Sequence, residues 1–205
     1  MKTRKHPLLL YQLISQRMRN KLLLFVILFL VAGLIDLLVL PVLGDLWYFV
    51  WIGFAGALLL WFYYAVLMKR AAIKVQPDLL IVQGPLTRLK ISYGRIYSAT
   101  SVRLEMHHSF KSLSGWQKGA FRPLYQETCV LIDLEGWPKA AGWQKNLLAK
   151  QLFSSTGPGI LCCVQDWIAL NQDIEVARGS WITRREARAK GDTRSLAAKV
   201  MSLKE

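Results

Sequence analysis

Two apolar stretches, LLLFVILFLVAGLIDLLVLPVL (Leu22–Leu43) and LWYFVWIGFAGALLLWFYYAVLM (Leu46–Met68), are separated only by Gly44 and Asp45. At about 1.5 Å of rise per helical residue, each stretch is long enough to cross a hydrocarbon layer roughly 30 Å thick. A link of two residues leaves no room for a domain between them. The sequence therefore predicts a transmembrane helical hairpin over residues 21–68, with both of its ends on one side of the membrane.

The charges that flank this hairpin predict which side that is. The link carries only Asp45, whereas the flanks carry the basic residues Lys2, Arg4, Lys5, Arg17, Arg19, Lys21, Lys69, Arg70 and Lys74. Basic flanks stay on the cytoplasmic side of a membrane. We therefore expect an integral membrane protein with both termini in the cytoplasm. A cleaved signal peptide is the alternative for the first stretch, but a second apolar stretch follows it at once.

Asp36 is the one charged residue inside the apolar stretches. An ionised carboxylate in hydrocarbon is costly unless it is paired or hydrated. Folding the hairpin at Gly44 places Asp36 near the level of Gly53, and Gly53 and Ala57 have the spacing that lets two helices approach closely. We expect an intramembrane polar contact formed by Asp36, Gly53 and Ala57, with helix packing favoured over ion transport. Contact with a partner subunit is the alternative.

The overall charge is strongly basic, at +14. The Lys and Arg residues are scattered along the chain rather than arrayed on one element, so a nucleic-acid partner is not expected. An anionic membrane surface attracts each well-placed basic side chain by about 1 kcal/mol. The expected partners are membrane lipids, together with a protein partner or a second copy of the chain that docks through the hairpin.

The first 20 residues allow two interpretations. Leu10, Ile14 and Met18 recur every four positions, which lines one face of a helix. Residues 1–20 are therefore either a short interfacial helix or a disordered basic tail.

Beyond Met68 the pattern changes to short β-like runs separated by Pro and Gly. Four runs with short links predict an antiparallel meander over Ala71–Gln76, Leu79–Gln83, Leu86–Tyr93 and Ile96–Met106. Two further strands are expected at Thr128–Leu134 and Ile160–Val164.

The segments between and after these strands have other patterns. Insertions are expected at 107–126, as a loop, and at 138–158, which holds an amphipathic helix over 138–153. Asn171 has the side chain of an N-cap for a C-terminal amphipathic helix that starts at Gln172. Residues 191–205 are expected to form a polar tail.

The segment AAIKVQPDLLIVQGPLTRLKISYGRIYSATSVRL (Ala71–Leu104) resembles the opening of bacterial pleckstrin-homology-like (PH-like) domains that are attached to membrane hairpins. The shared features are an L-I-V strand, a Gly-centred turn, a basic strand and an I-x-Y-x-x-I segment, here Ile91–Ile96. The resemblance implies a protein of the bacterial inner (plasma) membrane with a cytoplasmic α+β domain over residues 69–190. Its expected form is an antiparallel barrel or sandwich of about six or seven strands with a C-terminal helix, whose Trp181 plugs the barrel.

The resemblance leaves the ligand open. PH domains that bind phosphoinositides carry basic residues in their first hairpin turn, where this chain has Gln76–Asp78. Possible contacts with anionic lipid are expected instead at Arg88, Lys90, Arg95, Trp143, Lys145 and Lys150. For Arg88, Lys90 and Arg95 the alternative is a solvated strand face. For Trp143 the alternative is core packing.

No catalytic, cofactor-binding or metal-binding motif stands out. His107 and His108 are adjacent and do not share a face of a regular element. Asp133 and Glu135 do share one face of a strand, but a solvated face is a commoner explanation than a Mg²⁺ site.

The three cysteines all fall in the predicted cytoplasmic part. Cys162 and Cys163 are adjacent, so they match neither a redox motif nor a metal clamp. We expect Cys129, Cys162 and Cys163 to be buried free thiols, with no disulfide in a reducing compartment.

Together these features predict a non-enzymatic, membrane-anchored PH-like interaction module that mediates protein or lipid contacts at the cytoplasmic membrane surface. One alternative is an accessory subunit of a larger membrane complex, docked through the hairpin. The other is a membrane-surface enzyme of lipid or envelope metabolism that uses the Asp133 and Glu135 face or the adjacent histidines.

Overall fold

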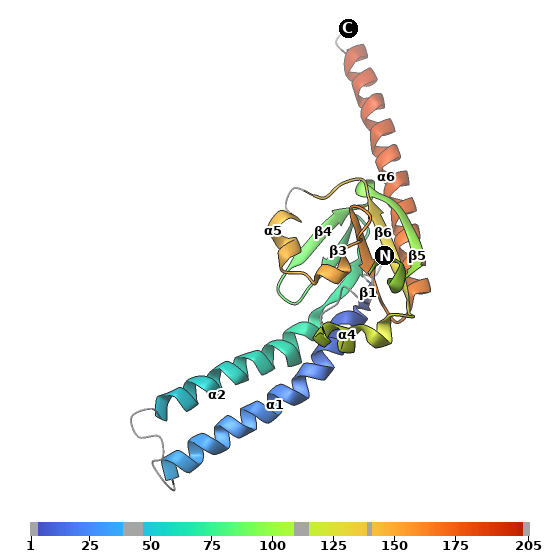
Figure 1. The fold of residues 1–205 in the computed structure, drawn as a ribbon. Coiled ribbons are helices and arrows are strands. Elements are labelled where there is room, and N and C mark those ends of the chain that lie inside the picture. The colour runs from blue at the N-terminus through green and yellow to red at the C-terminus, as the bar shows by residue number, and fades with distance from the viewer. Residues whose placement is uncertain (1–3, 39–46, 109–114, 139–140, 203–205) are drawn as a thin grey trace.

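The computed structural model describes residues 4–38, 47–108, 115–138 and 141–202 (Figure 1). Of these, Trp116, Gln117, Ala120, Ala141 and residues 190–202 are described by their backbone alone. Two long apolar helices lie side by side. At one end of them stand two antiparallel sheets and a long C-terminal helix. The chain therefore has an α+β fold that is compatible with a helical hairpin plus a β domain.

The helix pair consists of α1 (Leu9–Leu38) and α2 (Trp47–Phe62), and α2 continues through a π-helical turn, η2 (Tyr63–Leu67), into the 3₁₀ turn η3 (Met68–Arg70). Both helices are long and apolar enough to cross a membrane. Most of their large apolar side chains are exposed rather than packed inside the protein.

Small residues set the contact between α1 and α2. A Cβ atom on Gly53 would lie 2.8 Å from the Phe29 ring, and a Cβ atom on Gly33 would lie 3.2 Å from the Trp51 ring. Along α1 the contacts come at Phe29 and then Gly33, while their partners on α2 are Gly53 and then Trp51. The residue numbers rise on one helix as they fall on the other, so the helices are antiparallel. Close packing of aromatic rings on glycine backbones is a typical way for apolar helices to associate.

The first sheet has the strand order β1-β2-β3-β4, formed by β1 (Arg4–Pro7), β2 (Ala72–Val75), β3 (Leu79–Gln83) and β4 (Arg88–Ser92). Strands β1 and β2 are antiparallel neighbours, so α1 and α2 are inserted into the connection between them. Residues 4–20 form an edge strand and the first turns of α1. The predicted helix with Leu10 and Ile14 on one face is therefore present, but it continues directly into the apolar helix.

The second sheet has the order β5-β6-β7, formed by β5 (Ile96–Arg103), β6 (Thr128–Leu134) and β7 (Gly159–Cys162). The predicted meander is correct for β2 to β4 and wrong for β5, which pairs with β6. The chain changes sheet at the 3₁₀ turn η4 (Tyr93–Arg95). The buried Tyr93 holds this corner, because its hydroxyl donates a 2.7 Å hydrogen bond to the Gln76 carbonyl oxygen.

Leu8 joins the two sheets. Its N–H donates to the Ala71 carbonyl oxygen (3.2 Å), and the residue forms a bridge with Val164 at the end of β7. Neither sheet closes on itself within the described residues, so the expected barrel is an open pair of sheets.

The core lies between the sheets and includes the start of α1. Its fully buried side chains come from both sheets and from α1 and include Ile73, Leu80, Ile91, Val130, Ile132, Leu161, Leu10 and Tyr11. The helix pair is continuous with this core, because α1 begins in it, and Ser15 Oγ donates a 2.7 Å hydrogen bond to the Tyr64 carbonyl oxygen across the base of the pair.

The two segments predicted as insertions, 107–126 and 138–158, contain short helices. Within 107–126, expected to be a loop, lie the end of α3 (Leu104–His107), α4 (Gly115–Phe121) and the 3₁₀ turn η6 (Arg122–Leu124). The helix expected over 138–153 is divided into α5 (Ala141–Asn146) and the 3₁₀ turn η7 (Lys150–Leu152). It breaks at Ala149, whose N–H donates to the Tyr11 hydroxyl oxygen (3.0 Å) instead of to a helical carbonyl.

The C-terminal helix α6 (Trp167–Ser202) begins earlier and ends later than expected. Asp166 Oδ1 accepts the Ala169 N–H (2.9 Å), so Asp166 caps the helix and the predicted N-cap, Asn171, lies inside it. Leu170, Ile174 and Ala177 are fully buried against the sheets. Beyond them the backbone continues as a helix past the β domain, through most of the segment expected to be a polar tail (Figure 1).

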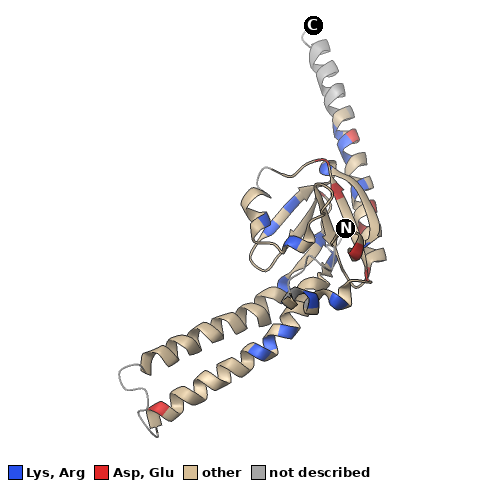
Figure 2. Cartoon of the chain, in the orientation of Figure 1, with Lys and Arg blue, Asp and Glu red and all other residues tan. Residues whose placement is uncertain are grey.

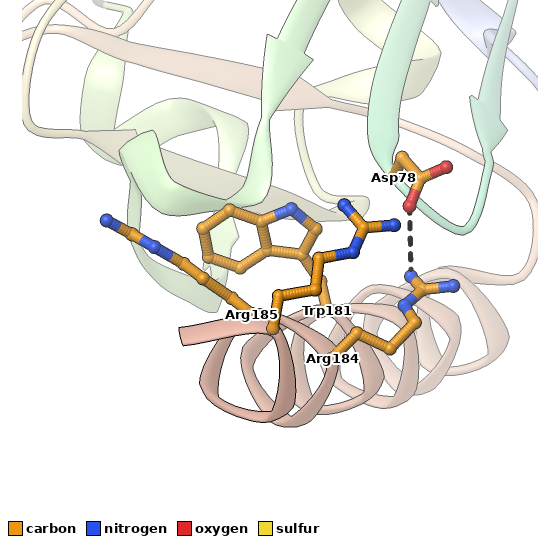
Figure 3. Close-up of a pocket in the computed structure, with 5 residues that line it drawn as sticks. Asp78, Trp181, Arg184 and Arg185 are labelled. Carbon is orange, nitrogen blue, oxygen red and sulfur yellow. Dashed lines mark ion pairs between the residues drawn. The ribbon is translucent and has the colours of Figure 1, made fainter. Parts of the chain in front are cut away.

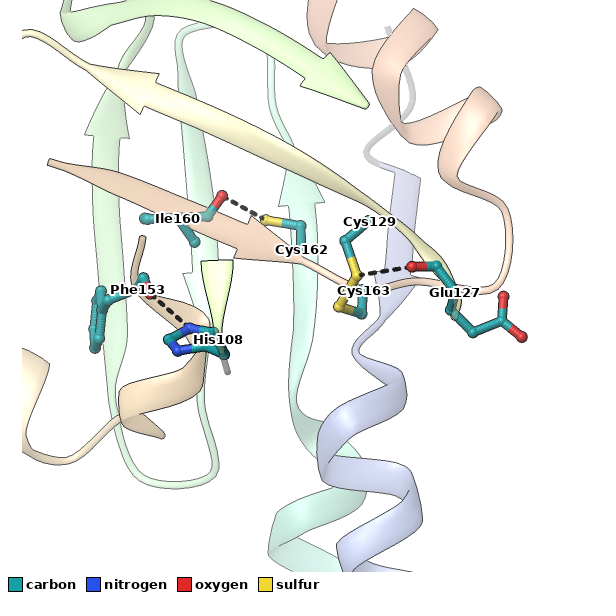
Figure 4. Close-up of a disulfide and its surroundings, with 7 residues drawn as sticks. All are labelled: His108, Glu127, Cys129, Phe153, Ile160, Cys162 and Cys163. Atoms are coloured by element: carbon teal, nitrogen blue, oxygen red, sulfur yellow. Dashed lines mark hydrogen bonds between the residues drawn. A yellow bond between two sulfur atoms is a disulfide. The ribbon is translucent and has the colours of Figure 1, made fainter. Parts of the chain in front are cut away.

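The expectation of three free thiols is wrong, because Cys129 and Cys163 form a disulfide (Figure 4). Val130 pairs with Cys162, so the antiparallel register places Cys129 beside Cys163, with 4.3 Å between the two Cα atoms. This register could not be read from the adjacency of Cys162 and Cys163. Cys162 remains a free thiol, and its complete burial raises its pKa.

Candidate functional site

The outward surface of the β1–β4 sheet carries a concentration of positive charge. Side chains alternate along β4, so Leu89 and Ile91 enter the core while Arg88 and Lys90 are exposed. Pairing brings one row of residues across all four strands, in the order Lys5, Lys74, Ile81 and Lys90. The next row runs in the order Pro7, Ala72, Gln83 and Arg88.

The adjoining turn η3 adds two more cations, Lys69 and Arg70. We call the six side chains Lys5, Lys69, Arg70, Lys74, Arg88 and Lys90 the basic face. Figure 2 shows Lys and Arg on this sheet and at the adjoining ends of α1 and α2, while Asp and Glu lie elsewhere. The first 104 residues contain only three acids, Asp36, Asp45 and Asp78.

A groove of ≈ 310 Å³ opens on the basic face where β1 and β2 meet η3. We call it the basic groove, and its lining is Lys5, Pro7, Lys69, Arg70, Ala72, Lys74 and Gln83. Its position follows from the fold, because β1 and η3 are the two ends of the inserted helix pair.

Like charges meet without compensation on this face. Lys5 and Lys74 are direct cross-strand partners, an arrangement that destabilises a sheet. The pKa of Lys74 is lowered, first by partial burial and then by the charges of Lys5 and Arg88. Within the described residues, none of the six basic-face side chains forms an ion pair. The arrangement suits an external anion.

The turn between β3 and β4 lies beside the same end of the helix pair. Ala72 pairs with Gln83, so the turn that follows Gln83 extends back toward η3. Leu86 in this turn is 62% exposed. An exposed apolar side chain therefore stands next to the basic groove.

The structure places only some of the predicted lipid contacts on the basic face. Arg88 and Lys90 belong to it. Arg95 lies in η4 beyond the opposite end of β4, where its guanidinium donates a 3.3 Å hydrogen bond to the Trp137 carbonyl oxygen.

Trp143 and Lys145 lie on α5, which contacts β4, and Lys150 lies on η7; none of the three lines the basic groove. The Lys145 ammonium nitrogen sits 3.4 Å from the centre of the Trp137 ring, and burial lowers the Lys145 pKa. Lys145 is thus engaged within the domain, whereas Trp143 and Lys150 are exposed.

The structure places Asp36 and Gly53 at different levels of the helix pair. Asp36 is half-buried in the last described turn of α1, and Gly53 faces Phe29, two helical turns or about 10 Å away along α1. Ala57 is buried on α2. Gly53 and Ala57 therefore serve helix packing at a different level from Asp36.

A second basic pocket lies on α6 and is lined by Asp78, Trp181, Arg184, Arg185 and Arg188 (Figure 3). Arg184 forms a 3.2 Å ion pair with Asp78 and donates a hydrogen bond to the Pro77 carbonyl oxygen. Trp181 packs against Gly94 rather than inside a closed barrel. These contacts hold α6 against the turn between β2 and β3.

The residues named for a possible enzyme site do not gather at one place, and several of them form hydrogen bonds within the domain. The His108 imidazole is within 3.0 Å of the Phe153 carbonyl oxygen (Figure 4), and burial lowers its pKa. The Ser98 hydroxyl donates to Asp133 (2.9 Å), while Glu135 is exposed. The described residues contain no group of three His, Cys, Asp or Glu that could hold a metal ion.

No protein-family model, curated protein or solved structure matches this chain. The positions of the basic side chains and of the groove are therefore the basis for assigning a function. Sequence reasoning missed Lys5, Lys69, Arg70, Lys74 and Gln83 as parts of one site, because the strand register that brings them together joins segments on both sides of the helix pair.

Proposed function

We propose that this protein is a non-enzymatic, membrane-anchored interaction module of PH-like architecture that contacts anionic lipid at the cytoplasmic membrane surface. One observation carries the proposal. The helix pair is inserted between β1 and β2, which places the basic face at the ends of the two apolar helices. Anchoring and surface contact thus come from elements that are adjacent in the fold.

The PH-like architecture is supported by the arrangement of elements. A four-stranded and a three-stranded antiparallel sheet enclose one core, Leu8 links them, and α6 packs against them. The strands β2, β3 and β4 follow the order that the resemblance of Ala71–Leu104 implies, and the C-terminal helix follows the last strand. In this chain the helix pair occupies the connection between the first two strands.

The membrane anchor is supported by the solvation of α1 and α2. Their apolar side chains are exposed along most of their length, which is costly in water and favourable in hydrocarbon. Basic residues flank both helices at the end near the sheets, so the β domain belongs on the cytoplasmic side.

The basic face has a role that anchoring alone does not require. Each well-placed cation gains about 1 kcal/mol at an anionic surface. The helix pair already keeps the protein in the bilayer, so this energy recruits anionic lipid around the protein and fixes the orientation of the sheets against the surface.

The test compares hydrogen exchange of the full-length protein in nanodiscs of phosphatidylcholine alone and in nanodiscs that also contain phosphatidylglycerol. We expect the anionic lipid to slow exchange in β2 and in the turn between β3 and β4. A variant with Lys5, Lys74, Arg88 and Lys90 all changed to Gln should lose this effect, and Lys150→Gln should keep it. Equal exchange in both kinds of disc would refute the proposal.

A further inference from the structure

Gln83 gives the basic groove a feature that general charge attraction does not explain. Its side chain is 9% exposed and lines the groove, and its Oε1 atom has no hydrogen-bond partner within the described residues. Buried polar groups are nearly always hydrogen-bonded. Its unpartnered Oε1 atom is closed to solvent in this structure, so a ligand with polar atoms of its own in the groove would satisfy it once the Gln83 side chain turns toward the four cations.

The lining defines the chemistry of that ligand. The ammonium groups of Lys5, Lys69 and Lys74 and the guanidinium group of Arg70 are donors that suit phosphate oxygens. The carboxamide of Gln83 can accept a hydrogen bond from a hydroxyl group. A ligand that carried a cation next to its phosphate would bring that cation into the cluster and be disfavoured.

The surroundings of the groove define where the ligand comes from. Lys69 and Arg70 directly follow the second apolar helix, so in the proposed orientation the groove opens at the level of lipid headgroups. The exposed Leu86 beside it can contact the adjoining acyl region. A membrane lipid fits these neighbours better than a free phosphate does.

We propose that the basic groove binds the headgroup of an anionic phospholipid in which a phosphodiester is joined to a hydroxyl-bearing group, as in phosphatidylglycerol. The cations hold the phosphodiester, and Gln83 accepts the headgroup hydroxyl. This assignment rests on the proposed function and adds a selectivity that contact with an anionic surface does not require.

The test is native mass spectrometry of the full-length protein in mild detergent with three added lipids. Phosphatidylglycerol has the charge and the hydroxyl, phosphatidylethanol has the same charge without a hydroxyl, and phosphatidylcholine is zwitterionic. We expect occupancy to fall in that order. Free glycerol phosphate should not displace the bound phosphatidylglycerol.

Variants separate the two parts of the site. The double variant Lys5→Gln, Lys74→Gln should lower the affinity for both anionic lipids by roughly fivefold for each charge removed. Gln83→Leu should lower the occupancy by phosphatidylglycerol to that of phosphatidylethanol and leave the occupancy by phosphatidylethanol unchanged. Gln83→Glu, which keeps the side-chain shape, should reject both. Lys150→Gln is the control and should match the wild type.

The outcomes distinguish this inference from the proposed function. Equal binding of phosphatidylglycerol and phosphatidylethanol, or an unchanged preference in Gln83→Leu, would overturn the headgroup assignment while the surface module stands. Unchanged binding in the double variant would overturn the groove as the site. Displacement by free glycerol phosphate would overturn the lipid source. Equal binding of all three lipids would overturn the proposed function as well.

Discussion

Lys5 and Lys74 lie directly opposite each other in the ladder of β1 and β2, although α1 and α2 separate them in the sequence. This pairing has two structural consequences. It joins the two strands that flank the inserted helix pair, and it brings two like charges together near the ends of α1 and α2. The concentration of positive charge at this position therefore lowers the stability of the sheet.

Lys74→Gln should stabilise the fold and weaken lipid binding. Removing one of two opposed cations relieves repulsion worth about 0.2–1 kcal/mol, so the midpoint of thermal unfolding in detergent should rise. The matched control is Lys90→Gln, because Lys90 stands opposite Ile81 rather than opposite a cation. An equal rise in both variants would contradict the repulsion between Lys5 and Lys74.

Gly53→Ala should weaken the packing of α1 on α2, whereas Gly56→Ala should not. A Cβ atom on Gly53 would lie 2.8 Å from the Phe29 ring, while one on Gly56 has nothing within 4 Å. Overpacking of this kind costs about 1–3 kcal/mol. Thermal unfolding in detergent compares the two variants, and equal stability would mean that the helices do not meet at Gly53.

Loss of the disulfide between Cys129 and Cys163 should cost about 2–4 kcal/mol, because it closes a loop over a sequence separation of 34 residues. Thermal unfolding with and without reductant measures the difference. Without reductant, the denatured protein should expose one thiol to alkylation, that of Cys162, and the native protein should expose none.

Three alkylated thiols in denatured, unreduced protein would contradict this disulfide. Trapping the thiols in intact cells adds a second result. Disulfides are rare in a reducing cytoplasm, so the oxidised fraction found there measures how well burial of Cys129 and Cys163 protects the bond.

Acid should destabilise the wild type through His108. Burial lowers the pKa of His108 in the folded state below its usual 6.5, so the unfolded chain binds the proton more readily. The contribution of His108 to stability is present above pH 6.5 and is lost as the pH falls through the lowered value. His108→Gln removes the titration, so its unfolding midpoint should fall less between pH 7.5 and pH 5. Equal losses would show that His108 does not titrate in this way.

The local elements of the fold could largely be predicted from the sequence. Long apolar runs define the helix pair, and the bounds expected for Leu79–Gln83 and Thr128–Leu134 match β3 and β6. These elements carry their own hydrophobic pattern and turn residues, so no distant contact is needed to recognise them.

Strand β1 could not be found in this way, and its side chains explain why. Its alternate residues, the exposed Arg4 and the largely buried His6, both contact Asp173 of α6, at 2.9 Å and 3.0 Å. An ionic contact thus replaces the apolar residues that mark a strand. The basic groove was missed for a related reason, because the flanking lysines were interpreted as topology signals and only the strand register unites them.

The most direct test of the central claim measures how deep two positions of the β domain lie relative to the bilayer. Spin labels on Leu86→Cys and Arg188→Cys, placed one at a time in the full-length protein in vesicles that contain phosphatidylglycerol, report their access to oxygen and to a water-soluble nickel complex. Buried Cys162 should leave the introduced thiol as the reactive one. The account predicts that the Leu86 label lies at the headgroup level and that the Arg188 label lies in water. A fully aqueous profile at both positions would contradict a β domain held with its basic face at the membrane.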